Sequence, residues 1–252
     1  MKKIICFVLI SMLAVSCKDD DTLETTSIEI SFANKINSQN IELNTGVYQT
    51  TLGESYSINE LKYIISNISF IQEDGKIFTY PVEDSYFLID EEVPSSKIIS
   101  LENIPVANYK KIEFGIGVDQ SNYPLNGVDN FVPTAQESQM LWSWSAGYIF
   151  FKIEGEYSST GDQPDDDFLF HIGSHGTNLD NYKTVELSSD FGFDFTENTL
   201  VSIEADLSKL FNAVYDIRIE DKPDIQVDPV NAPKIAENAS QLFSSVPLNS
   251  TE

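Results

Sequence analysis

The chain has 252 residues, a formal net charge of −25 at pH 7, and Phe, Tyr and Trp at 12% of its residues. Such an excess of acid disfavours nucleic acid and anionic lipid surfaces as partners, and it favours cations. The length fits one large β domain, and the aromatic content is enough for a solid core. The sequence has neither an internal repeat nor a central linker rich in Pro, Ser and Gly, so we expect a single folded domain.

The N-terminal segment predicts export and a lipid anchor. Residues 1–16 begin with a basic start and continue into an apolar run that is too short to span a bilayer, as in a signal peptide. Ala14-Val-Ser-Cys17 resembles a relaxed bacterial lipobox, so we expect Cys17 to become a lipidated N-terminus that binds the membrane. The alternative is an ordinary cysteine after a signal for soluble secretion.

Residues 17–27 are expected to form an acidic tether between the anchor and the domain. The cluster Lys18-Asp-Asp-Asp21 resembles the surface-export signals of some outer-membrane lipoproteins. We therefore expect an outer-membrane lipoprotein that faces outwards. The alternative is that the cluster only keeps the tether solvated.

Short segments of β type dominate the rest of the chain, and turn residues separate them. They predict an all-β fold, an antiparallel β-sandwich of one domain with short helical turns over residues 28–220. The expected strands are Ser27–Phe32, Ile41–Asn44, Val47–Thr50, Lys62–Ile71, Lys76–Val82, Tyr86–Ile89, Lys97–Leu101, Tyr109–Val118, Val185–Leu187 and Leu200–Ala205.

Other segments depart from this strand pattern. Ser57–Glu60 has the form of a capping box, which predicts at most one helical turn. Asp119–Glu137 is a long loop, and long loops in compact domains are often functional, so we expect it to shape a pocket rim. Residues 221–252 are expected to pack on the domain as a C-terminal extension, with a short amphipathic helix that docks Leu242 and Phe243.

The stretch Met140–Gly155 contains both tryptophans of the chain and no charge before Lys152. Aromatic and β-branched residues dominate its second half, which favours a buried strand. On such a strand the side chains of Met140, Trp142 and Trp144 point to the same face. They form either a slab of the core or one wall of a binding pocket, and composition alone favours the core.

The two histidines of the chain, His171 and His175, follow an acidic loop. Gly173 and Gly176 argue against a helix here, and an extended strand would separate the two positions by about 13 Å. A loop that contains glycine can instead fold back and bring both imidazoles to one point. The alternative is a structural His171 at a strand end and a solvated His175.

Several motifs together resemble the MbnP-like family of bacterial copper-binding envelope proteins. The most specific is Met140-x-Trp-x-Trp-x-x-Gly-Tyr148, followed by Glu154-Gly155 and by His171-x-Gly173. Weaker similarities lie in the same order along the chain, so the resemblance extends over residues 28–211. These weaker segments are Leu61–Phe70, Tyr109–Asp119 and Asp206–Phe211.

The resemblance implies a copper(I) site, since imidazole and thioether are ligands that suit this soft ion. It implies His171 as the first ligand, with His175 and Met140 as further candidates. In the family a partner dihaem oxidase converts a tryptophan to kynurenine at the copper site, which makes Trp142 or Trp144 the candidate here. Family members often carry a histidine after the phenylalanine of the first strand, where this chain has Asn34.

The sequence does not indicate an enzyme. It has no Gly-rich phosphate loop, no His-Glu-x-x-His and no Gly-x-Ser-x-Gly motif. The first hypothesis is therefore a cell-envelope lipoprotein that binds copper(I) in a site lined by His, Met and Trp. The alternative is a surface lipoprotein that binds a protein, glycan or other ligand on the same sandwich without a metal, with structural histidines.

Overall fold

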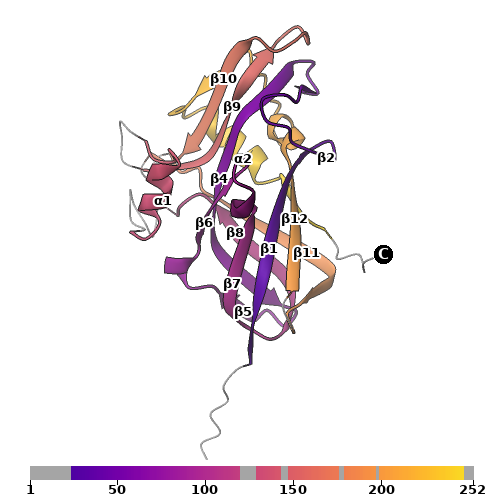
Figure 1. Ribbon diagram of the computed structural model, residues 1–252, viewed down its shortest axis with the longest axis vertical. Coiled ribbons are helices and arrows are strands. Elements are labelled where there is room, and N and C mark those ends of the chain that lie inside the picture. Colours follow the sequence, from indigo (N-terminus) through magenta and orange to yellow (C-terminus); the bar gives the residue numbers. More distant parts are fainter. Residues whose placement is uncertain (1–23, 120–128, 143–146, 176–178, 197–198, 247–252) are drawn as a thin grey trace, which may run out of the picture.

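The computed structural model describes residues 24–119, 129–142, 147–175, 179–196 and 199–246. Within these residues the strands form two sheets, one of five strands and one of nine (Figure 1). The first sheet contains β14 (Phe243–Val246), β12 (Thr199–Asp206), β1 (Thr25–Ile36), β2 (Gln39–Asn40) and β7 (Ile98–Pro105).

The second sheet carries the residues of greatest functional interest. Its main path runs in the order β11 (Lys183–Asp194), β8 (Asn108–Ile116), β4 (Ser55–Gln72), β9 (Ile149–Ser158), β10 (Asp166–Gly173) and β13 (Asp224–Ile225). Three shorter strands pair with the opposite edge of β4, namely β3 (Tyr48–Gln49), β5 (Ile77–Thr79) and β6 (Tyr86–Asp90).

The two sheets enclose one large apolar core. On β1, for example, Ile28, Ile30, Phe32 and Ile36 are buried while the residues between them are more exposed, as expected for a strand that covers a core with one face. Alternate residues of β4, β9 and β10 join the same core. The expected all-β sandwich is confirmed.

Most strand pairs are antiparallel, with two exceptions. β1 runs parallel to β12 over eight residue pairs, and β10 runs parallel to β13 over two. Parallel neighbours need a crossover connection rather than a hairpin, and adjacency of this kind between distant segments is not encoded in local alternation. The sandwich is therefore mixed rather than purely antiparallel.

Two local expectations are wrong. Ser57–Glu60 lies inside the 18-residue strand β4 rather than in a helical turn. Tyr56 and Ile58 are fully buried in the core there, and this burial outweighs the local capping pattern. Ile41–Asn44 is not a strand but leads into a turn over Leu43–Thr45, in which Asn44 has a φ of 63° and the Gly46 N–H donates to the carbonyl of Glu42.

The stretch from Met140 to Gly155 is not one continuous strand. β9 begins only at Ile149, and the described residues on either side of 143–146 pair antiparallel, with Leu141 opposite Tyr148. We call these two segments, Met140–Trp142 and Gly147–Ile149, the hairpin. The long loop before this hairpin includes the helix α1 (Val132–Glu137). The hairpin and α1 together cover part of the outer face of the larger sheet, beside β6 (Figure 1).

The C-terminal part completes the core. A 3-10 helix (Leu207–Phe211) precedes α2 (Ala232–Ala239), and β14 then pairs with β12. Ile235, Leu242 and Phe243 are buried in the same core as β1. Shorter 3-10 turns lie at Val82–Asp84 and Pro94–Lys97. No helix in the described part of the chain is long and apolar enough to cross a membrane.

Candidate metal site

A second apolar cluster lies on the outer face of the nine-stranded sheet, and we call it the outer cluster. It positions the hairpin that carries Met140 and Trp142 over strands β4 and β9. Aromatic contacts hold it together, with the ring of Phe131 5.9 Å from those of Tyr86 and Tyr148. Its buried members are Ile64, Tyr86, Val118, Phe131, Ala135, Met140, Trp142, Tyr148, Ile149 and Phe150.

Backbone hydrogen bonds fix the hairpin in place. The Met140 N–H donates to the carbonyl of Ala135 at 2.7 Å, which ties the hairpin to the end of α1. The Ile149 N–H donates to the carbonyl of Met140 at 2.8 Å, and the Trp142 N–H donates to the carbonyl of Gly147 at 3.2 Å. The direction of the Trp142 side chain is therefore set by a short but hydrogen-bonded element.

The indole of Trp142 lies beside both histidines of the chain. Its ring centroid is 6.0 Å from that of His171 and 5.2 Å from that of His175, and both ring pairs are tilted. Trp142 is only 6% exposed, whereas both histidines are half-buried. The structure thus brings the two imidazoles to one indole.

His171 is held by a carboxylate. It lies on the outer face of β10, since its neighbours Phe170 and Ile172 point into the core between the sheets. Its Nε2 is 2.7 Å from the Glu154 carboxylate of the adjacent strand. Burial lowers the pKa of His171 below its usual value, although Glu154 acts in the opposite direction. The imidazole is therefore neutral near pH 7, and its contact with Glu154 is a hydrogen bond.

His175 lies just after β10. Its N–H donates to the carbonyl of Leu179 at 2.9 Å. Burial lowers the pKa of His175 as well, so both imidazoles are neutral near pH 7. Neutral imidazole is the form that ligates a metal.

Comparison with known proteins now assigns the family. The MbnP family model matches residues 25–228, which is most of the chain. The chain belongs to the MbnP family. The solved structure of MbnP from Methylosinus trichosporium covers 75% of this chain and 78% of its own, with a TM-score of 0.51 and 15% sequence identity. At this identity the likeness supports the fold alone. None of the curated proteins compared with the chain matches it.

The glycines of the MbnP-like motifs have a steric reason in this structure. A Cβ atom at Gly155 would lie 1.9 Å from the carbonyl oxygen of Ser57, and one at Gly173 would lie 2.3 Å from that of Tyr148. The Gly173 position also faces the indole nitrogen of Trp142 at 3.2 Å. Glycine at these two sites therefore lets β4 and the hairpin approach strands β9 and β10 closely.

Asn34, where the MbnP-like resemblance implies a histidine, lies away from Trp142 and the two histidines. It is 3% exposed, accepts a hydrogen bond from the Tyr63 hydroxyl at 2.8 Å, and donates to Glu91 at 2.8 Å. Tyr63 belongs to the core between the sheets, whereas His171 lies on the outer face of the larger sheet. The absence of a histidine at position 34 thus removes no imidazole from the neighbourhood of His171.

The remaining candidate residues are placed as follows. Met140 is fully buried in the outer cluster, together with Trp142. Trp144 and Cys17 lie outside the described residues. Within the described part of the chain, no three His, Cys, Asp or Glu side chains are grouped as ligands of one metal ion. The donor set beside Trp142 is therefore two neutral imidazoles with a thioether nearby, which fits soft copper(I) better than it fits oxygen-seeking Ca²⁺ or Mg²⁺.

Sequence reasoning missed the charged side chains beside His171. Lys152 is only 4% exposed and lies between Glu60 at 2.7 Å and Glu154 at 3.2 Å. Burial acts to raise the pKa of Glu60, but Lys152 and Lys62 outweigh it and hold the pKa below its usual value. The available signal was the pair Lys152 and Glu154, which share one face of a strand that is otherwise apolar.

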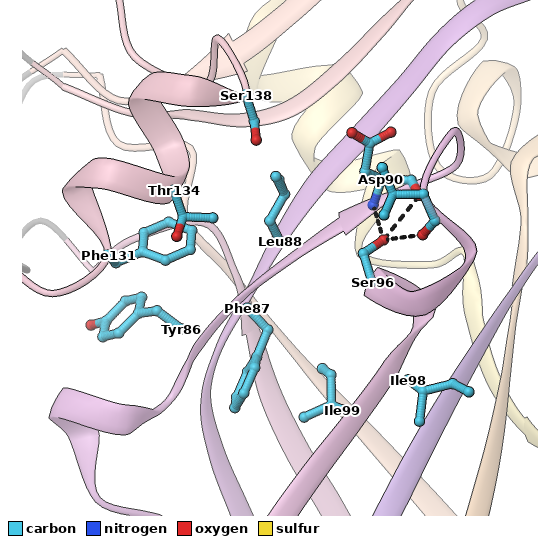
Figure 2. Close-up of a pocket in the computed structure, with 11 residues that line it drawn as sticks. Tyr86, Phe87, Leu88, Asp90, Ser96, Ile98, Ile99, Phe131, Thr134 and Ser138 are labelled. Carbon is cyan, nitrogen blue, oxygen red and sulfur yellow. Dashed lines mark hydrogen bonds between the residues drawn. The ribbon is translucent and has the colours of Figure 1, made fainter.

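A separate groove of about 400 Å³ adjoins the outer cluster (Figure 2). It runs between α1, β6 and the start of β7, and it shares Tyr86 and Phe131 with the outer cluster. Its walls are largely apolar, with the Asp90 and Ser96 side chains at one end. Phe131 and Thr134, from the described end of the expected loop Asp119–Glu137, therefore line this groove, in line with the expectation for that loop; residues 120–128 of the loop lie outside the described part of the chain.

Proposed function

We propose that this MbnP family member binds a single copper(I) ion beside Trp142, with His171 and His175 as ligands. The observation that carries the proposal is the position of the only two imidazoles of the chain against one indole. Both are neutral near pH 7 because burial lowers the pKa of each. Imidazole nitrogen is a suitable ligand for copper, and the sequence after Cys17 contains no cysteine to compete for a soft metal.

Each neighbouring residue has a distinct part in this proposal. Glu154 engages Nε2 of His171, which leaves Nδ1 as the nitrogen available to the metal. Trp142 shields the ion from water, because its ring is almost fully buried next to both ligands. Met140 supplies a thioether from the apolar side, either as a third ligand or as part of the wall.

A copper(I) titration against a competing chelator tests the ligands. We expect the wild-type protein to bind one copper(I) ion tightly under reducing conditions. The His171→Ala/His175→Ala variant should lose at least about 100-fold in affinity, because it lacks both imidazole ligands. Met140→Leu keeps the side-chain volume and removes the sulfur, so its affinity shows whether the thioether ligates the ion. Circular dichroism and thermal unfolding establish that each variant is folded.

Equal copper uptake by the wild type and the double histidine variant contradicts the proposed site. A failure of both to bind calls for protein purified from the native host, because modification of a tryptophan is part of the family's copper site. We propose Trp142 as the oxidised residue and a dihaem oxidase as the partner, since Trp142 lies next to both imidazoles. Mass spectrometry of the tryptic peptide from native protein shows whether Trp142 or Trp144 is kynurenine.

We also propose that the domain is carried on a lipid anchor at the bacterial outer membrane, facing outwards. The apolar leader, Cys17 and the acidic residues directly after it support this location. Cells grown with a clickable fatty-acid analogue should label the wild-type protein and leave Cys17→Ala unlabelled. Equal labelling of the two proteins rules out lipidation at this cysteine, and protease treatment of intact cells tests the outward orientation.

A second candidate function is the binding of an organic ligand without a metal, and the apolar groove between α1 and β6 favours it. In that case the histidines are structural and the groove is the site. Replacement of Thr134 by Trp would fill part of the groove from α1, where Thr134 is one of its lining residues. This variant leaves both imidazoles unchanged, so ligand loss without copper loss would separate the two functions.

A further inference from the structure

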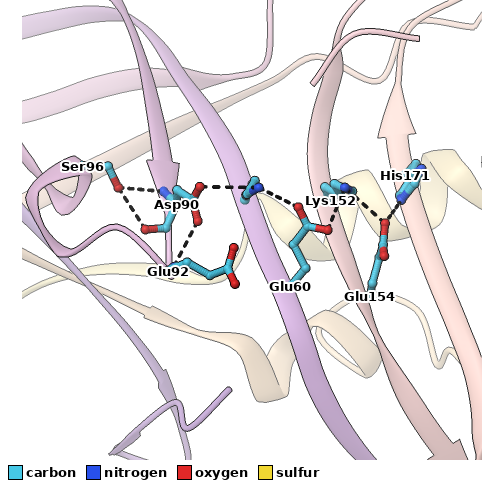
Figure 3. Close-up of polar contacts among 8 residues, drawn as sticks. Glu60, Asp90, Glu92, Ser96, Lys152, Glu154 and His171 are labelled. Carbon is cyan, nitrogen blue, oxygen red and sulfur yellow. Dashed lines mark hydrogen bonds and ion pairs between the residues drawn. The ribbon is translucent and has the colours of Figure 1, made fainter. Parts of the chain in front are cut away.

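A row of alternating charges crosses four strands of the larger sheet and ends at His171 (Figure 3). We call it the charged row. Its members come from β6, β4, β9 and β10 and lie on the outer face, next to the outer cluster. In order across the sheet they are Asp90, Lys62, Glu60, Lys152, Glu154 and His171.

Each contact in the charged row joins opposite charges until the last one. Lys62 is 3.5 Å from Asp90 and 2.7 Å from Glu60, and Lys152 is 2.7 Å from Glu60. The strand register places Lys62 directly opposite Lys152, and Glu60 opposite Glu154. Two like-charged pairs across adjacent strands are tolerated because each lysine has a carboxylate within reach.

The lysines and Asp90 of the charged row are shielded from water, whereas the Glu154 side chain is 35% exposed. The side chains of Lys152, Lys62 and Asp90 are 5%, 10% and 9% exposed, so charge on them acts over a longer range than it does at the surface. Three carboxylates and two ammonium groups give the row a net charge of minus one when His171 is neutral. This negative charge lies directly behind the proposed copper ligand.

We propose that the charged row positions His171 and sets the reduction potential of the bound copper. Glu154 accepts the Nε2 hydrogen of the imidazole and so fixes the tautomer with Nδ1 free. Lys152 pairs with Glu154, Glu60 pairs with Lys152, and both add charge behind the ligand. The inference rests on the proposed copper site, because a potential exists only when copper is bound, but the tautomer can be measured without copper.

The tautomer is tested in metal-free protein by ¹⁵N NMR of the histidine ring nitrogens. We expect wild-type His171 to be neutral and protonated at Nε2, and the Glu154→Ala variant to lose this preference. Glu156→Gln removes a charge from the same strand and is the matched control, for which no change is expected. A His171 ring that carries its hydrogen on Nδ1 in the wild type overturns the positioning role, whatever the protein binds.

The charge effect is tested by the copper(II)/copper(I) potential of loaded variants. Removal of a negative charge destabilises copper(II) more than copper(I), so Glu60→Gln and Glu154→Gln should both raise the potential, with the larger rise for Glu154. Lys152→Met should lower it. Each tenfold difference between the effects on the two oxidation states corresponds to about 59 mV. Glu154→Gln should also weaken copper(I) binding about 10-fold to 100-fold.

Control variants distinguish three outcomes: loss of folding, absence of the copper site, and absence of an effect of the charged row on the potential. Lys152→Met leaves carboxylates short of a partner and can lower stability, whereas Glu60→Gln/Lys152→Met restores the net charge of the row and should return the potential close to the wild-type value. Lys111→Met removes a charge from an exposed ion pair on β8 and should change nothing. If copper binds through His171 and these variants all share one potential, the inference is wrong while the copper site stands.

Discussion

Replacing Trp142 with alanine should lower the free energy of unfolding by about 3–5 kcal/mol, the usual cost of removing a buried large aromatic side chain. The indole is 6% exposed and packs in the outer cluster with residues from α1, β4 and β9. Its loss leaves a void that a hydrogen-bonded hairpin cannot close easily. Urea unfolding followed by far-ultraviolet circular dichroism, at matched pH and salt, measures the change.

Tyr215→Ala is the control for this measurement. Tyr215 is 43% exposed, so removal of its ring should cost much less than removal of the Trp142 ring. A similar loss for the two variants, or a loss below about 1 kcal/mol for Trp142→Ala, would show that the indole does not hold the outer cluster together. Trp142 would then be a pocket residue with little part in folding.

A second substitution at this position, Trp142→Phe, separates the role of Trp142 in packing from its role in copper binding. Trp142→Phe keeps an aromatic ring in the outer cluster, so it should restore much of the stability that alanine removes. It cannot be converted to kynurenine. Protein from the native host that carries Trp142→Phe should therefore fold and lack the modified residue, which isolates the copper role of Trp142 from its packing role.

The fold class followed from local patterns because alternation along each strand reports which face is buried. β1 shows this directly, since every second residue from Ile28 to Ile36 is buried. The parallel pairing of β1 with β12 was not accessible in the same way, because the two strands are separated by more than 160 residues and pairing leaves no local signal. The capping-box pattern at Ser57–Glu60 misled for the opposite reason, since burial of Tyr56 and Ile58 decided the structure.

The candidate site was predictable in its residue types and less so in its geometry. Gly173 and the rarity of histidine pointed to His171, and the glycine proved to matter because the hairpin lies directly on it. The strand expectation for Met140–Gly155 failed because Leu141 pairs with Tyr148 of the same stretch, and Gly147 between them has a φ of 129°, which favours glycine. Glu154 and Lys152 were visible only as charges, and their link to His171 depends on the pairing of β9 with β10.

The second large effect concerns pH. Copper(I) affinity should stay constant from neutral pH to below the usual histidine pKa of about 6.5 and then fall by up to about 100-fold per pH unit, because two imidazoles must lose their protons to bind. Burial lowers the pKa of both His171 and His175, so the fall begins at a lower pH than it would for exposed histidines. A chelator competition titration at several pH values measures it.

The free energy of unfolding of the metal-free protein should also decrease as pH falls. A histidine whose pKa is lowered by folding binds fewer protons in the folded state than in the unfolded state, so it contributes stability above about pH 6.5 that is lost as pH falls through the lowered pKa. The free energy of unfolding should therefore decrease as pH falls from about 6.5 to the lowered pKa values, which is just above the pH range in which copper affinity falls, and His171→Ala should weaken both dependences.

Variants that keep only one of the two histidines distinguish a histidine site from a carboxylate site. With His175→Ala only one imidazole has to be deprotonated, so any residual copper binding should fall about tenfold per pH unit rather than about 100-fold. A carboxylate site would instead lose its ion near pH 4, where aspartate and glutamate take up protons. A single transition near pH 4 in the wild type, unchanged in both histidine variants, would place the metal among the many acidic side chains and away from Trp142.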